Sequence, residues 1–432
     1  MGRPRKNQTA SSAYVPKKVQ SLEGLEDITA DTDALWSVIL NRLARFGRVY
    51  GFEKVEAPLL EDARLYENFY KASPFELSQV VRVDAGGHQA AIRADLLPSM
   101  LRPYYQQKVY DKSPVSKWMS SGFVVRQDEK QNLRSDYRFG FEVFGAFNHL
   151  TEAQIIGGVW EFLQSLGLKD SSLEINHIGQ ADCQETYSQA LRDYLSGKKY
   201  QLCDSCVEHL DGRVLSVFRC GNLDCQALLS EAPTVLDFLD EASKKHFTNI
   251  LEALDELRIP YQLNPFFAGG EGSGRTNLVI KYKNKGENVV IGEGAYHDSL
   301  IQSLCGKAYC CFGFSGSLSV VRQLLEANKI TTTKEQHSEV FLVPLGELAA
   351  KKALRLFKDL TGEKISVYDH FGQSGVKNQL KQAEMSHAPV ALIMGQKEAA
   401  DEMVILRDVK SGMQEIISYD KIVAEVKKRL GR

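Results

Sequence analysis

The chain has 432 residues, of which 43% are hydrophobic and 25% are charged, and its formal net charge is −2. This length exceeds that of one ordinary domain, and the composition excludes an intrinsically disordered chain, a collagen and a disulfide-rich miniprotein. A net charge so close to zero gives no global field that would attract nucleic acid. Since no apolar run is long enough for a membrane helix or a signal peptide, we expect a cytoplasmic protein without a membrane partner.

Residues 1–22 are basic and poor in apolar side chains, which predicts a disordered tail. The run Gly2-Arg3-Pro4-Arg5-Lys6 is similar to a hook that binds the minor groove of DNA. A single copy of such a run favours a solvated tail over a hook, so DNA is not an expected partner.

Residues 23–330 favour an α+β domain in which helices pack on an antiparallel sheet. Apolar residues recur at helical spacing after Asp31, and residues 80–93 alternate as in a hairpin that turns at Ala85-Gly86-Gly87. Further helices and strands are predicted at 122–127, 137–145, 151–166, 186–196, 234–257, 278–282 and 288–291.

The eight cysteines are too few, in a chain of this length, for a disulfide framework. Four of them lie in the segment 200–226, as the pairs Cys203 and Cys206, and Cys220 and Cys225. The spacing of the first pair is typical of structural Zn²⁺ sites, whereas that of the second pair is looser. Scattered buried thiols and a redox role are the alternatives.

A polar stretch at 327–338 predicts a linker to a second domain at 338–432. There, short apolar strands alternate with helical segments, which predicts a small α/β domain with a mostly parallel sheet. Four basic residues share one face of its first helix and suit either a solvated surface or contacts to RNA phosphates; they are Lys351, Lys352, Arg355 and Lys358.

From about residue 22 the order of these elements resembles histidyl-tRNA synthetase, a family of class II aminoacyl-tRNA synthetases. The most specific runs lie in the last domain, where Ser374 to Ala383, Ala391 to Gly395 and Leu406 to Gly412 are similar to the family's second helix and its third and fourth strands. The resemblance implies a class II synthetase-like catalytic domain followed by an anticodon-binding domain. It also implies a homodimer that binds tRNA and uses ATP and Mg²⁺.

One run resembles the second class motif, whose arginine binds the α-phosphate of ATP and the carboxylate of the amino acid. This run is Phe123-Val124-Val125-Arg126-Gln127-Asp128-Glu129. A planar guanidinium suits this role because it can meet two oxygens at once. The resemblance assigns Arg126 to catalysis and Asp128 to the adenine amine. It assigns Glu142 to the α-amino group of the substrate, and it places Arg138 where the family has glutamine.

Three places depart from the family's motifs. The family's Arg-Pro-Glu-Gly-Thr is here Arg93-Ala94-Asp95-Leu96-Leu97, so the acid is shortened to Asp95 and a threonine that helps to hold the amino group is lost. The catalytic arginine of the histidine-recognition stretch falls on Gly269, and the arginine of the third class motif falls on Ser319 or Val320. Loss of a paired guanidinium at a phosphoryl centre costs on the order of 10³ in rate.

The sequence therefore predicts a histidyl-tRNA synthetase-like paralogue whose histidine activation is weakened or lost, and which binds tRNA or a protein partner. The first alternative is a divergent but active histidine–tRNA ligase, in which Arg275 and Arg322 replace the missing guanidinium groups. The second is a regulatory subunit of histidine biosynthesis, a derivative of the same fold that normally lacks the C-terminal domain.

Overall fold

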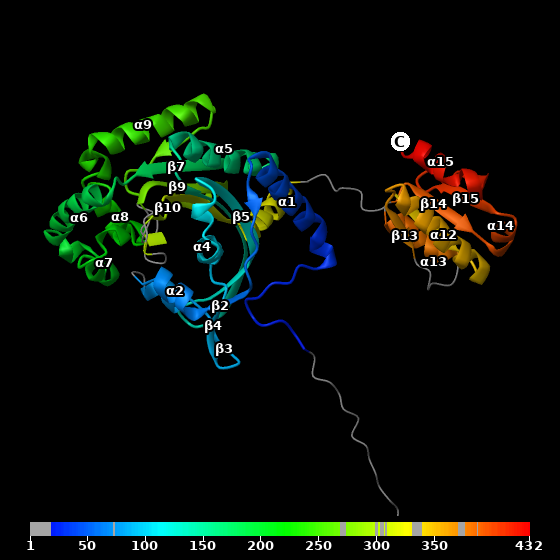
Figure 1. The fold of residues 1–432 in the computed structure, drawn as a ribbon, viewed down its shortest axis with the longest axis horizontal. Helices are drawn as coiled ribbons and strands as arrows, with labels where there is room; N and C mark the ends of the chain where they lie inside the picture. The colour runs from blue at the N-terminus through cyan, green and yellow to red at the C-terminus, as the bar shows by residue number, and fades with distance from the viewer. Residues whose placement is uncertain are drawn as a thin grey trace, which may run out of the picture. The chain divides into compact units, whose positions relative to one another are not determined.

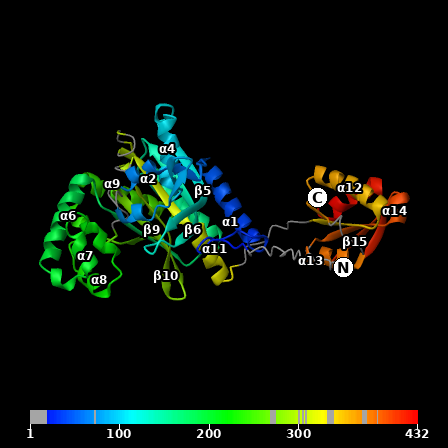
Figure 2. The ribbon, with the colours of Figure 1, turned by 90° about the horizontal axis from the view of Figure 1, so that it is seen from below.

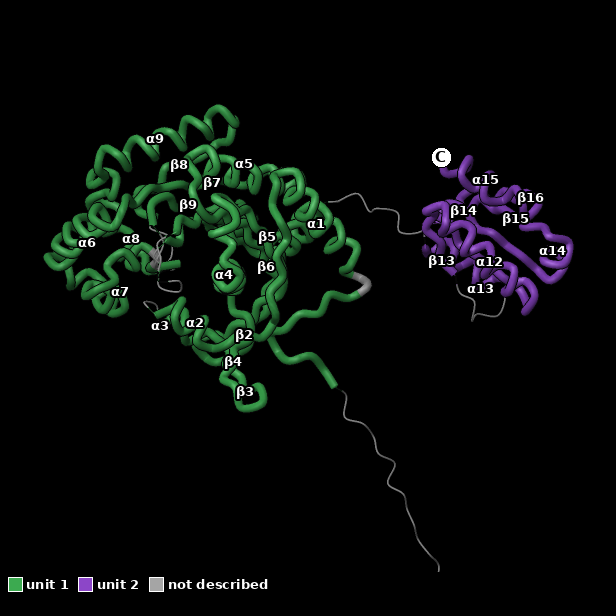
Figure 3. The backbone as a smooth tube through the Cα atoms, in the orientation of Figure 1, with its two compact units in different colours: residues 1–332 green, residues 333–432 purple. Residues whose placement is uncertain are grey.

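The computed structural model describes residues 19–71, 74–267, 274–298, 301–302, 306, 309–330, 339–369, 376–386 and 388–432. The chain divides into two compact units, Met1–Thr332 and Thr333–Arg432 (Figure 3). Most of the predicted tail, the position Gly269 and most of the predicted linker lie outside the described residues. Within the described ranges, no helix combines the length and the apolar character that crossing a membrane requires.

The first unit is built on an eight-stranded sheet (Figure 1). Its pairs are antiparallel, as the sequence predicts, except that the outermost pairs β1·β5 and β7·β8 are parallel. In spatial order the strands are β1 (Glu53–Lys54), β5 (Val115–Gln127), β6 (Leu133–Gly145), β11 (Cys311–Ser317), β10 (Glu287–Tyr296), β9 (Gly274–Asn284), β7 (Ser171–His177) and β8 (Gln262–Leu263).

One face of this sheet is covered by the helices α1 (Ala30–Val49), α5 (His149–Ser165), α9 (Glu241–Glu256) and α11 (Leu318–Ala327). Because side chains alternate across a strand, Phe139, Phe141 and Val143 of β6 all enter this main core. Gly47 lets α1 approach the sheet, since a Cβ there would lie 2.0 Å from the sulfur of Met119.

The opposite face is covered by α2 (Ala63–Phe69) and α4 (Leu96–Gln106). Trp118 of β5, Phe144 of β6 and Cys311 of β11 enter this second core. The predicted hairpin forms β3 and β4 of a small three-stranded sheet beside these helices. The remaining elements here are β2 (Leu60–Asp62), α3 (Pro74–Ser78), β3 (Arg82–Ala85), β4 (His88–Ile92) and the 3-10 helix η1 (Val109–Asp111).

The cysteine-bearing segment belongs to a helical module that has a core of its own. Its helices lie together at one end of the unit in both views (Figures 1 and 2). They are α6 (Ala181–Ser196), η2 (Lys199–Gln201), α7 (Asp204–His209), η3 (Val214–Arg219), α8 (Leu223–Leu229) and η4 (Val235–Phe238).

The second unit contains a five-stranded sheet in the order β13-β12-β14-β15-β16. Its pairs β12·β13 and β12·β14 are parallel, but β14·β15 and β15·β16 are antiparallel, so the predicted mostly parallel sheet is wrong for half of the pairs. The connections before β15 and β16 are too short for a parallel crossover, which needs a dozen or more residues. The elements are β12 (Val340–Pro344), α12 (Glu347–Gly362), β13 (Val367–Asp369), α13 (Val376–Met385), β14 (Val390–Met394), α14 (Gln396–Ala400), β15 (Met403–Asp408), β16 (Gln414–Ser418) and α15 (Tyr419–Arg429).

Candidate active site

Three of the predicted site residues belong to the face of the large sheet that α2 and α4 cover. Phe139, Phe141 and Val143 point into the main core, so the alternate positions Arg138 and Glu142 of β6 project to the other face. Arg126 of β5 projects to this face too, where it reaches the carbonyl of Ala94 just before α4. The sheet thus brings two guanidinium groups and a carboxylate to one surface.

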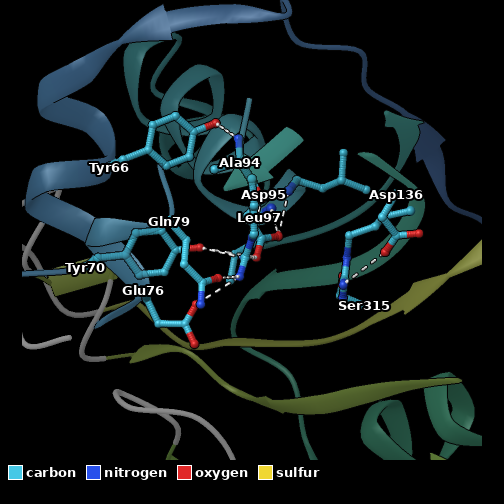
Figure 4. A network of polar contacts seen from close by, with 12 residues as sticks. Tyr66, Tyr70, Glu76, Gln79, Ala94, Asp95, Leu97, Asp136 and Ser315 are labelled. Carbon is cyan, nitrogen blue, oxygen red and sulfur yellow. Dashed lines mark hydrogen bonds and ion pairs between the residues drawn. The ribbon is translucent and has the colours of Figure 1, made fainter. Parts of the chain in front are cut away.

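Arg126 is the centre of a polar network, and its partners Tyr70, Glu76, Ala94 and Asp95 are labelled in Figure 4. Its Nη1 donates to Oε2 of Glu76 at 2.9 Å, and its Nη2 donates to Oδ2 of Asp95 at 2.9 Å. Nη2 also donates to the hydroxyl of Tyr70 at 3.1 Å, and Nε donates to the carbonyl of Ala94 at 2.8 Å. Two carboxylates are therefore paired with the single charge of this guanidinium.

Asp95 holds its place because it is also the N-cap of α4. Its Oδ1 accepts the amide of Leu96 at 2.6 Å, while Oδ2 faces Arg126. Burial raises the pKa of Asp95, but the charges of Arg126 and Arg138 and the helix amides outweigh it, so the pKa is lowered overall. The shortened acid is thus an ionised partner of Arg126.

Arg138 lies on the same face between β6 and β11. Its Nη2 donates to Oγ of Ser315 at 3.1 Å, and its Nη1 lies 3.5 Å from a carboxylate oxygen of Asp136 (Figure 4). Its Nε is buried and has no hydrogen-bond partner among the described residues. A buried donor without a partner is costly, so this group is available to a ligand that accepts hydrogen bonds.

Glu142 is buried against β11, with 1% of the residue exposed. Its side chain lies over its cross-strand neighbour Gly313, where a Cβ would lie 1.8 Å from Oε2 of Glu142. Its Oε2 accepts from the thiol of Cys311 at 3.4 Å, which is a weak donor. Burial, and to a smaller extent the charge of Asp95, raises the pKa of Glu142 to about 8.

Asp128 stands apart from this network. Its carboxylate accepts the backbone amides of Lys130 and Asn132 at 3.0 and 2.9 Å, and it contacts Arg134 at 3.5 Å. These bonds fold the turn between β5 and β6. The structure brings Arg126, Asp95, Arg138 and Glu142 to one surface, whereas Asp128 organises the turn at the edge of it.

Arg275, the first candidate replacement for a missing arginine, is held at the start of β9. Its guanidinium carbon lies 3.6 Å from the ring centroid of Tyr296, and Nη2 is ion-paired with Asp298. The other oxygen of Asp298 accepts the backbone amide of Cys311 at 2.9 Å. Since the thiol of Cys311 contacts Glu142, Arg275 is linked to Glu142 through Asp298 and Cys311.

Arg322, the second candidate, packs on the other face of the sheet. Its guanidinium carbon lies 5.9 Å from the ring centroid of Trp36 in α1, a residue of the main core. It forms ion pairs with Glu26 at 3.1 Å and with Glu326 at 2.9 Å, and 13% of its side chain is exposed. Of the two possible motif positions, Ser319 binds the backbone amide of Tyr137 at 2.9 Å, and Val320 has no charge.

Sequence reasoning missed Tyr70 and Glu76 as partners of Arg126. Both come from a segment without a recognisable motif, which runs along the end of β5 through a bridge between Val80 and Arg126. No local sequence signal indicates this contact, because it depends on where the chain after α2 crosses the strand.

The predicted metal ligands Cys203, Cys206, Cys220 and Cys225 do come together, in the helical module. None of them contributes to the network around Arg126.

The fold is that of a class II aminoacyl-tRNA synthetase. Its large, mostly antiparallel sheet carries the motif arginine in a long hairpin, and its glycine-rich strand β11 leads into a helix. A separate C-terminal unit has a five-stranded sheet. Residues 24–321 match the family model of histidyl-tRNA synthetase, and residues 339–429 match that of the anticodon binding domain. The chain belongs to the histidyl-tRNA synthetase family. Members of this family use ATP and Mg²⁺ and bind tRNA.

Curated relatives match over nearly the whole chain. A histidine–tRNA ligase of Dehalococcoides mccartyi (strain 195) is 28% identical over 416 residues, which cover 95% of this chain and 100% of the relative. One of Caldicellulosiruptor bescii is 25% identical over 423 residues, which cover 96% of this chain and 99% of the relative. An active member of the family would accordingly be a histidine–tRNA ligase.

Two solved structures show the same fold. The apo histidyl-tRNA synthetase of S. aureus superimposes with a TM-score of 0.79 at 23% identity, covering 95% of this chain and 100% of the other. A protein of Bacillus halodurans C, titled as an ATP phosphoribosyltransferase regulatory subunit/histidyl-tRNA synthetase, gives a TM-score of 0.61 at 17% identity. The match covers 85% of this chain and 97% of the chain of that protein.

Proposed function

We propose that this chain is a histidyl-tRNA synthetase paralogue whose histidine activation is weakened or lost and which binds tRNA, as a cytoplasmic homodimer. The observation that supports this most strongly is the position of Arg322. It is the candidate for the arginine of the third class motif, but it packs against Trp36, on the face of the sheet opposite to Arg126 and Glu142.

For Arg322 to serve the reaction centre, it would have to leave Trp36 and two ion pairs and reach the other face of the sheet. The two positions that fit the motif hold a serine that is already bonded to the backbone and a valine. A triphosphate bound beside Arg126 would therefore lack one guanidinium, and each lost donor of this kind costs on the order of 10²–10³ in rate.

The residues that remain still suit an anionic and zwitterionic ligand. Arg126 and Arg138 would hold the phosphate or carboxylate oxygens, with the unpartnered Nε of Arg138 as a free donor. Glu142 and Asp95 would meet an ammonium group. In the free protein, however, Glu76 and Asp95 compete with any anion for Arg126, because both are already paired with it.

The match of the second unit to an anticodon binding domain supports the proposed binding of tRNA. The basic stripe on α12 adds little to this support, since three of its members already have acidic neighbours. Lys351 contacts Glu347 at 2.8 Å, Lys352 contacts Glu402 at 2.8 Å, and Arg355 lies 4.0 Å from Asp359.

A divergent but active histidine–tRNA ligase is the second candidate, and the position of Arg275 favours it. Arg275 is linked to Glu142 through Asp298 and Cys311, which supports a role for this guanidinium near the proposed site. The fold of the B. halodurans protein keeps a regulatory subunit of histidine biosynthesis as a third candidate, but the anticodon-binding unit argues against it.

Histidine-dependent exchange of pyrophosphate into ATP distinguishes these candidates. The proposal expects exchange at least about 10³-fold slower than that of an ordinary histidyl-tRNA synthetase assayed beside it. Exchange at an ordinary rate, abolished in Arg126→Ala and retained in the control Arg82→Ala, would establish the active ligase instead. Arg82 is an exposed arginine of β3 that pairs with Glu67, outside the network.

Binding of tRNA is tested by titrating the full chain with tRNA at several salt concentrations. We expect affinity that falls steeply with salt, since phosphate contacts release counterions. A chain that shows neither exchange nor tRNA binding would support the regulatory alternative and contradict the proposal.

A further inference from the structure

The helical module at one end of the first unit brings four thiols to one point. The sulfur atoms of Cys203, Cys206, Cys220 and Cys225 all lie within 4.8 Å of one another. They come from the residue that caps α7, from α7 itself, from the residue after η3 and from α8. Two segments of the chain, about 13 residues apart, thus supply two ligands each.

We propose that these four cysteines bind one structural Zn²⁺. Four thiolates at the usual Zn–S distance of about 2.3 Å form a tetrahedron whose sulfur atoms are about 3.8 Å apart. The sulfur atoms of Cys203 and Cys220 lie 3.7 Å apart, and the limit of 4.8 Å holds for all six pairs. This separation is far from the roughly 2.05 Å of a disulfide.

Backbone amides already point at the sulfur atoms, as they do in thiolate sites. The amide of Cys203 donates to Sγ of Cys225 at 3.2 Å, and that of Asn222 donates to Sγ of Cys220 at 3.4 Å. Such bonds stabilise a negatively charged sulfur and fix the direction of the ligand. With four protein ligands there is no open position, so the site is structural and not catalytic.

The module has a physical need for such a site. Apart from α6, it consists of short helices and 3-10 turns, with no strand between Ala181 and Phe238, and its core is separate from the main one. Small cores of this kind gain a large share of their stability from a metal or a disulfide. Cys206 and Cys225 are themselves buried in this core, so a metal would join α7 to α8 from within.

The metal content of the purified full chain tests this proposal directly. We expect about one zinc per chain by elemental analysis, and in protein reconstituted with Co²⁺ the visible absorption of tetrahedral thiolate coordination. Zinc below about 0.1 per chain after zinc-supplemented expression, or iron in its place, would overturn the proposal. A mercurial reagent should release the metal as it modifies four thiols, and this measurement needs no variant.

A matched pair of variants locates the site. Cys206→Ser should lose most of the zinc, whereas Cys183→Ser should keep it, because Cys183 is a buried cysteine of the same module outside the cluster. Equal zinc in both variants would contradict the assignment. If Cys206→Ser does not fold, Cys220→Ser replaces it, since Cys220 is less buried. A mass of the intact protein that is lower by the hydrogen atoms lost in disulfide formation would reveal disulfides and refute the metal site.

Discussion

The first unit buries two glutamates on opposite faces of its large sheet, and their surroundings differ sharply. Glu152 of α5 has no exposed surface and accepts hydrogen bonds from Thr276 at 2.9 Å and from Tyr296, and it is paired with His246 at 2.8 Å. Glu142 of β6 is almost as buried, but the hydrogen bond that it accepts comes from a thiol.

The contrast separates a structural carboxylate from one that suits a ligand. A buried charge is tolerated when strong donors surround it, and it destabilises the fold when they do not. Glu152 ties α5 and α9 to the strands β9 and β10, so it belongs to the fold. Glu142 lacks such donors and therefore keeps its proton up to about pH 8, and an ammonium group from a ligand would favour its charged form.

The largest expected effect is at Glu152. Glu152→Ala should lower the free energy of unfolding by about 3–5 kcal/mol, because it leaves Thr276, Tyr296 and His246 without their shared acceptor. Urea unfolding measures this change. Glu161→Ala, an exposed position of the same helix, should cost below about 1 kcal/mol. Similar losses of unfolding free energy in the two variants would contradict the structural role of Glu152.

Glu142→Gln should instead stabilise the protein at neutral pH. Between pH 4.5 and about 8 the native state keeps a proton on Glu142 that the unfolded chain releases. The contribution of this residue therefore lowers the free energy of unfolding as the pH rises. Replacing it should raise the free energy of unfolding at pH 7 by on the order of 3 kcal/mol, and by little near pH 4.5. A difference that does not change with pH would contradict this account.

His177, which joins the Glu152 cluster through Thr276 at 3.3 Å, should make the fold sensitive to acid. Burial, with the charges of His246 and Arg275, lowers the pKa of His177 to about 3, so below its ordinary value of 6.5 only the unfolded chain gains the proton. Stability should fall by about 2 kcal/mol between pH 6.5 and 5. Denaturant titrations should show a shallower fall in His177→Asn but not in the exposed control His88→Asn.

The smallest effect is expected at Arg322. Arg322→Gln should cost about 1 kcal/mol of stability through its lost ion pairs and packing on Trp36. Any residual pyrophosphate exchange should stay within about twofold of the parent chain, because the proposed function gives this side chain no contact with the nucleotide. A large loss of exchange would place Arg322 in the reaction and favour the active ligase.

Much of the fold could be predicted because its signals are local. The helical spacing after Asp31, the hairpin at 80–93 and the strands on both sides of the turn at Asp128 all form where the sequence pattern indicates. The mixed sheet of the second unit was missed, because the direction of β15 depends on the length of the connection before it.

The site was predictable only in part, because its pairings join distant segments. The motif identifies Arg126, but only the fold shows that Glu76 and Asp95 neutralise it. Counting along α11 leaves open where Arg322 points, and the packing of α11 against α1 decides it. The cysteine spacing suggested a metal, and the convergence of the two pairs depends on the packing of α7 against η3 and α8.

Gly313 constrains which residue can stand at position 142. Its missing side chain makes room for the carboxylate across the strand, so alanine at 313 would force the side chain of Glu142 to move. Among descendants of this chain, a lineage that replaces the glycine should therefore change the acid as well, whereas a lineage that keeps the glycine is free to keep or to lose the acid.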